Sequence, residues 1–70
     1  MQKYLIILEK GENNYSAYSA DILGCVATGS TKVEAEINMR EAIQLHIDGL
    51  KEDNLPIPEP ASTAEFIMVE

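Results

Sequence analysis

The chain has 70 residues and a net charge of −7, with 12 acidic and 5 basic residues. This length suits a single domain, residues 1–70, whose own hydrophobic core would be marginal. Nucleic-acid binding requires clustered Lys and Arg, and no such cluster occurs here, so we expect no direct contact with DNA or RNA. The acidity favours either a basic protein partner or simple solubility.

We expect the protein to work in the cytoplasm and not in a membrane. The longest apolar run, Tyr4–Leu8, is far shorter than the roughly 20 residues needed to span a bilayer. The N-terminus leads straight into this run without a signal-peptide pattern. The single cysteine, Cys25, cannot form an intramolecular disulfide and is compatible with a reducing compartment.

The first half of the chain predicts three short strands. Tyr4–Leu8 is apolar at odd and even positions, so both faces of this strand should be covered. A turn at residues 11–14 separates it from a second strand over Tyr15–Ala20. Asp21–Gly24 then turns the chain into a third strand over Cys25–Thr28. Together these strands should form an antiparallel meander.

A helix is predicted from Thr31 to about Glu52. Thr31 and Glu34 fit a capping box, in which the two side chains satisfy free amides of the first turn. Only Gly49 weakens the helical pattern. At 100° per residue, one face collects Ala35, Met39, Ala42, Ile43, His46 and Leu50. Two alanines and Gly49 on its centre line would let the helix lie close to a sheet.

The proline-rich stretch Leu55–Pro60 cannot continue the helix. We interpret it as an extended spacer, with a polyproline ligand for an aromatic groove as the alternative. Phe66–Val69 then predicts a fourth strand, parallel to the third through a right-handed crossover. The expected fold class is thus α+β in the order β-β-β-α-β, with one helix packed on a four-stranded mixed sheet. Tyr4–Leu8 would lie in the middle of this sheet, beside the last strand, and the uncovered face predicts a homodimer or a dimer of dimers.

Several motifs taken together resemble the HicB-like antitoxin family. They are Asp21-Ile22-Leu23-Gly24-Cys25, Gly29-Ser30-Thr31, Glu34-Ala35, Asn38, Glu41-Ala42 and Pro56-Ile57-Pro58-Glu59-Pro60. None is specific alone, but their order and spacing are, and they cover the chain from Tyr4 to about Pro60. Ala20 and Leu23 depart from the family pattern by replacing two prolines, and Asn54 stands near a common glycine.

The resemblance implies a partial ribonuclease-H-like fold and a function in toxin neutralisation. Such an antitoxin blocks a small basic HicA-type toxin, an RNA-cleaving enzyme, by protein–protein contact. Many family members add a C-terminal DNA-binding domain, which we expect this chain to lack. The alternative function is an orphan HicB-like oligomeric scaffold or regulatory subunit without a toxin. A short neighbouring reading frame for a basic protein would distinguish the two.

The residues do not predict an enzyme. A ribonuclease-H-type nuclease needs carboxylates on its central strand to bind two metal ions, and Tyr4–Leu8 contains none. Cys25 has no second ligand nearby and is interpreted as a small buried hydrophobe. His46 is either a pH-sensitive imidazole or, as we prefer, a half-buried packing residue. We therefore expect no catalytic residue, metal site or cofactor.

One surface of the predicted helix suggests a binding site. Val33 and Ile37 lie on the face opposite the core stripe and are flanked by Glu36 and Arg40. Isolated exposed apolar residues are common on protein surfaces. Two of them at positions i and i+4, between charged neighbours, can instead form a strip that contacts a partner. These four residues are the candidate contact site.

Overall fold

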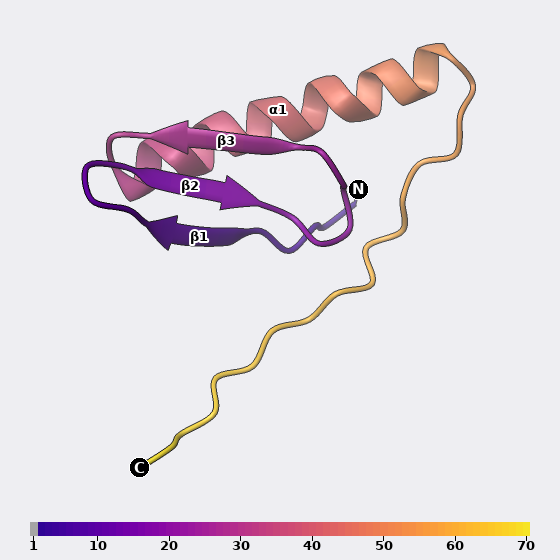
Figure 1. Cartoon of the computed structure of the whole chain (residues 1–70). Helices are drawn as coiled ribbons and strands as arrows, with labels where there is room; N and C mark the ends of the chain where they lie inside the picture. Colours follow the sequence, from indigo (N-terminus) through magenta and orange to yellow (C-terminus); the bar gives the residue numbers. More distant parts are fainter. Residues whose placement is uncertain (1) are drawn as a thin grey trace.

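Three strands and one helix make up the folded body in the computed structural model, which describes residues 2–70. The strands are β1 (Ile7–Lys10), β2 (Tyr15–Tyr18) and β3 (Val26–Gly29), and α1 (Lys32–Glu52) crosses one face of their sheet (Figure 1). The sheet order is β1-β2-β3, and both neighbouring pairs are antiparallel. The predicted antiparallel meander is therefore confirmed.

The first strand lies at an edge of the sheet, and not in its middle as the sequence predicts. β1 begins at Ile7, which pairs with Tyr18, the last residue of β2. The chain turns after Tyr18, so the residues before Ile7 have no strand to pair with. The segment Gln2–Ile6 consequently approaches the sheet without joining it.

The fourth strand predicted at Phe66–Val69 is wrong. The described element order is β-β-β-α, and the chain after α1 is an extended segment whose last part leaves the body (Figure 1). The four side chains of Phe66–Val69 are 81–105% exposed. A strand requires a neighbour for its backbone hydrogen bonds, and this segment has none in the structure. The expected four-stranded mixed sheet is replaced by a three-stranded antiparallel sheet with one helix.

The helix begins where the capping residues place it. The Thr31 hydroxyl oxygen accepts a hydrogen bond from the Glu34 amide at 3.1 Å. The Glu34 carboxylate accepts from the Ser30 amide at 3.0 Å and from the Ser30 hydroxyl at 3.2 Å. The side chains of residues 31 and 34 thus satisfy amides at the start of the helix, as predicted, although Glu34 reaches the residue before the cap.

The helix ends in a Schellman motif, which explains why Asn54 can occupy a position where glycine is common. Asn54 adopts a left-handed conformation with φ 55°, which Asn tolerates better than most residues. The Leu55 amide donates to the Leu50 carbonyl at 2.9 Å, and the Asn54 amide donates to the Lys51 carbonyl at 3.2 Å. These bonds satisfy carbonyl groups that the last turn would otherwise leave free.

The core lies between α1 and the sheet. Its buried residues are Ala17, Ile22, Cys25, Met39 and Ile47, around which Tyr4, Ile6, Leu8, Ala27, Ala42, Ile43, Leu50 and Ile57 are partly buried. Ile47 is buried, whereas His46 is exposed, so the predicted packing role of His46 is wrong. Of these two adjacent residues, the more apolar one is thus in the core. No helix in residues 2–70 is both long enough and apolar enough to cross a membrane.

Gly49 is not needed for close packing, contrary to the sequence-based interpretation. A Cβ atom at this position would meet no heavy atom within 4 Å. We therefore expect Gly49→Ala to raise the free energy of unfolding by up to about 1 kcal/mol, because Ala loses less backbone entropy in a helix. Urea denaturation followed by circular dichroism measures this change. Gly24→Ala is the matched control and should destabilise, because Gly24 has φ +79°; an unchanged midpoint for Gly49→Ala would contradict the argument.

Candidate functional site

The outer surface of α1 carries the four residues predicted to contact a partner. Val33 is 64% exposed and Ile37 is 46% exposed, and Glu36 and Arg40 are also exposed. We call these four residues the helix strip. A helix places residues i and i+4 one above the other, so Val33 and Ile37 form one continuous apolar patch. Their exposure leaves them available to a partner, while their role in binding stays a prediction.

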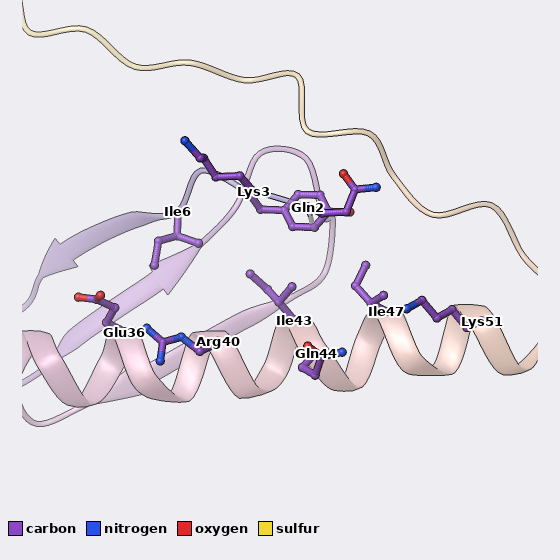
Figure 2. Close-up of a pocket in the computed structure, with 10 residues that line it drawn as sticks. Gln2, Lys3, Ile6, Glu36, Arg40, Ile43, Gln44, Ile47 and Lys51 are labelled. Atoms are coloured by element: carbon purple, nitrogen blue, oxygen red, sulfur yellow. The ribbon is translucent and has the colours of Figure 1, made fainter.

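A groove separates α1 from the segment that leads into β1. Its volume is about 710 Å³. One wall consists of Gln2, Lys3, Tyr4 and Ile6, and the other consists of Glu36, Arg40, Ile43, Gln44, Ile47 and Lys51 of α1. Ile43 and Ile47 rise from the helix toward the N-terminal wall (Figure 2). Glu36 and Arg40, the two charged residues of the helix strip, thus also line this groove.

The groove concentrates the positive charge of an acidic protein. Lys3, Arg40 and Lys51 line it, which is three of the five basic residues in the chain, against one acidic residue, Glu36. We call this feature the basic groove. The sequence alone does not predict this groove, because Lys3 is remote in sequence from the two helix residues. Arg40 and Lys51 lie eleven positions apart, close to three helical turns. This spacing indicates that the two basic residues share one side of the helix.

The segment after the helix is attached to the body at two points. The Tyr4 hydroxyl donates a hydrogen bond to the Pro58 carbonyl at 2.6 Å. Ser62 donates to the Asp21 carboxylate twice, from its hydroxyl at 2.9 Å and from its amide at 3.2 Å. The proline-rich stretch is therefore an extended connection held against the body. Beyond Ser62, residues 63–70 form what we call the C-terminal tail.

Titration of Asp21 affects the second attachment point. Burial by itself raises the pKa of its carboxyl, but hydrogen bonds from Ser62 and from the Ala61 amide outweigh burial and lower this pKa below the usual value. Because the folded-state pKa is lowered, the stabilisation by these bonds is present above the unfolded-state pKa. It is lost as the pH falls through the folded-state pKa.

The residues considered for chemistry lie apart from the groove. Cys25 is buried in the core, where burial raises the pKa of its thiol and disfavours the nucleophilic thiolate. The imidazole of His46 is exposed on α1. Among the described residues 2–70, no three His, Cys, Asp or Glu side chains gather as potential metal ligands. The prominent features of this surface are thus the exposed apolar patch and the basic groove.

A small α+β fold with an exposed helix strip and an open groove defines a protein suited to binding other macromolecules. The chain belongs to the family described as HicB_like antitoxin of bacterial toxin-antitoxin system, which matches residues 4–69. The resemblance seen in the sequence motifs is thereby confirmed. An antitoxin role in general follows from this membership.

Relatives occur in archaea, bacteria and a phage. A UPF0150 protein of Thermoplasma acidophilum is 44% identical over 68 residues, which cover 96% of this chain and 96% of that protein. A UPF0150 protein of Helicobacter pylori is 41% identical over 49 residues, covering 70% of this chain and 68% of the relative. An uncharacterized protein of Haemophilus phage HP1 is 36% identical over 64 residues, but the chain spans only 48% of its length. No solved structure matches the chain.

Proposed function

We propose that the protein neutralises a small basic ribonuclease toxin of the HicA type by binding over its RNA-cleaving site in the cytoplasm. Family membership supports the antitoxin role. The observation that carries the toxin contact is the apolar pair Val33 and Ile37, exposed on the surface of a chain with net charge −7. Such a surface offers a basic partner both opposite charge and apolar area.

Charge and apolar contact would have separate effects on the kinetics of the complex. Long-range attraction speeds encounter, whereas desolvated apolar contacts slow dissociation. Exposed charges are screened over about 8 Å at physiological ionic strength. Added salt should therefore slow association more than it speeds dissociation.

Replacing both apolar residues of the helix strip tests the contact surface. We expect the double variant Val33→Ser, Ile37→Ser to raise the dissociation rate from the toxin at least about tenfold, since contacts near the centre of an interface dominate its affinity. Its association rate should change little. Surface plasmon resonance with the basic protein encoded by a neighbouring reading frame measures both rates. Leu45→Ser is the matched control, because Leu45 is an exposed residue of α1 outside the helix strip.

Two results would redirect this proposal. Unchanged kinetics in the double variant would remove the helix strip from the interface and leave the antitoxin role standing. Failure to bind any basic partner, at low or high salt, would favour the alternative of an orphan oligomeric scaffold or regulatory subunit. Circular dichroism of the variant must match that of the parent protein for either conclusion.

We further propose that the protein self-associates as a homodimer or a dimer of dimers. The supporting observation is the amount of apolar surface that the single chain leaves in solvent. The strand β3 exposes Val26, and the C-terminal tail exposes four consecutive large apolar residues, Phe66–Val69. Large apolar side chains gathered in solvent, such as the four consecutive ones of the tail, mark interaction sites in soluble proteins. This observation also gives the orphan scaffold its support as the second candidate function.

A further inference from the structure

We propose that the basic groove of one copy receives the C-terminal tail of a second copy. The proposal rests on the self-association proposed above, for which it names the contacting parts, and it does not depend on toxin binding. Three observations carry it: the exposure of the tail, the chemical match between tail and groove, and the geometry of the groove.

The C-terminal tail carries four consecutive large apolar residues in solvent. Phe66–Val69 are 81–105% exposed, so no part of their own chain covers them. Ser62 is the last residue with a hydrogen bond to the body, and the tail leaves the body beyond it (Figure 1). Burying these side chains is favourable wherever an apolar surface of suitable shape is accessible to an extended segment.

The basic groove complements the tail in both polarity and charge. Ile6, Ile43 and Ile47 give it an apolar lining, with Lys3, Arg40 and Lys51 around them. The tail has the converse pattern, since acidic residues at positions 65 and 70 flank its apolar centre. Outside the groove the chain has only two basic residues, Lys10 and Lys32, and its acidic residues outnumber them, so the rest of the chain repels the acidic ends of the tail. Charge thus favours the groove over other parts of the same surface.

The groove also has the length and the backbone groups that an extended segment needs. From Glu36 to Lys51 the helix wall measures about 22 Å at 1.5 Å per residue. Fully extended, residues 63–70 span at most about 27 Å. The opposite wall includes residues 2–6, which lead into the edge strand β1 and pair with no strand in the structure. Their backbone is open to an extended segment from outside the chain.

A second copy is the occupant because its own tail points elsewhere. Ser62 is bonded to Asp21, in the connection between β2 and β3, and the tail continues outward from that point. If two copies exchange tails, each contributes one groove and one tail, and the arrangement closes with twofold symmetry. Each copy would then bury three parts of its surface in the dimer: its tail, the helix wall of its groove and the N-terminal wall of its groove.

Cysteine cross-linking tests the pairing directly. Two single variants of the full-length protein, Gln44→Cys in the groove and Met68→Cys in the tail, are mixed and oxidised. We expect a disulfide-linked dimer containing one chain of each variant, with Cys25 staying reduced because it is buried. Leu23→Cys, at an exposed position outside the groove, replaces Gln44→Cys in the control mixture and should yield at least about tenfold less cross-linked dimer.

A chain that carries both Gln44→Cys and Met68→Cys distinguishes exchange from return of the tail to its own groove. Tail exchange predicts disulfide-linked dimers of this double variant. A cross-linked monomer at high dilution and at high concentration would overturn the proposal in favour of the chain's own tail. Ile67→Cys is tested beside Met68→Cys, because the two positions present opposite faces of the tail. Absence of a cross-link with both tail variants would also overturn the proposal.

Sedimentation equilibrium separates failure of this proposal from failure of self-association. We expect Phe66→Ser with Met68→Ser to raise the dimer dissociation constant at least about tenfold, the equivalent of 1.4 kcal/mol. Leu23→Ser, which removes an exposed apolar side chain outside both the tail and the groove, should leave the constant within twofold. A parent protein that stays at 7.7 kDa at all concentrations would overturn both proposals. A parent dimer unaffected by the tail variant would overturn tail exchange and leave self-association standing.

Discussion

Replacing Gly29 by Ala should remove a large part of the stability of the fold. Gly29 is the last residue of β3 and is buried against the first turn of α1. A Cβ atom here would lie 2.5 Å from the Ala35 amide nitrogen and 2.8 Å from the Glu34 carbonyl carbon. Both atoms belong to the backbone, so the strand end or the helix start must move.

Overpacking of this kind costs about 1–3 kcal/mol or more, while a core of this size supplies roughly 3–5 kcal/mol in total. We expect the urea midpoint of Gly29→Ala to fall by at least about a third, or the variant to be unfolded in buffer. Gly49→Ala makes the same chemical change in open space and should have the opposite sign. A Gly29→Ala variant as stable as its parent would show that β3 and α1 can separate without cost.

Truncating Met39 should have the second large effect. Its side chain is 0% exposed and packs in the core between α1 and the sheet. Met39→Ala loses buried apolar area and leaves a cavity, which together cost about 2–5 kcal/mol. Thermal unfolding followed by circular dichroism should show a much lower midpoint than in the parent protein.

Val33→Ala provides the comparison for this truncation, since Val33 lies on the same helix but is exposed. Surface substitutions of this type change stability by about 0.5 kcal/mol or less. Similar midpoints for Met39→Ala and Val33→Ala would contradict the assignment of Met39 to the core.

The features that the sequence predicts correctly depend on neighbours close in the chain. Thr31 and Glu34 fix the start of the helix through contacts within one turn, and the prolines after Leu55 prevent the helix from continuing. The meander follows from short turns between adjacent strands. For the same reason, the exposure of Val33 and Ile37 could be predicted from helical periodicity alone.

The predictions that are wrong depend on parts of the molecule that are distant in sequence. Phe66–Val69 has the composition of a strand, but composition does not identify the strand edge that would pair with it, or whether that edge belongs to the same copy of the chain. His46 and Ile47 are adjacent on the helix, and packing against the sheet decides which of the two enters the core. The basic groove combines Lys3 with Arg40 and Lys51, which the fold brings together from opposite ends of the chain.

The two attachments of the segment after α1 have a consequence for chain entropy. If the Tyr4–Pro58 bond alone held this segment, residues 59–70 would form the free tether. With the Asp21–Ser62 bonds as well, the free tether is shortened to residues 63–70. Because each halving of a flexible tether saves about 0.6 kcal/mol of closure entropy, the anchored origin raises the effective concentration of Phe66–Val69 at any surface within its reach. The hydroxyl groups of Tyr4 and Ser62, which do not belong to the apolar residues, thus limit the volume that those residues can reach.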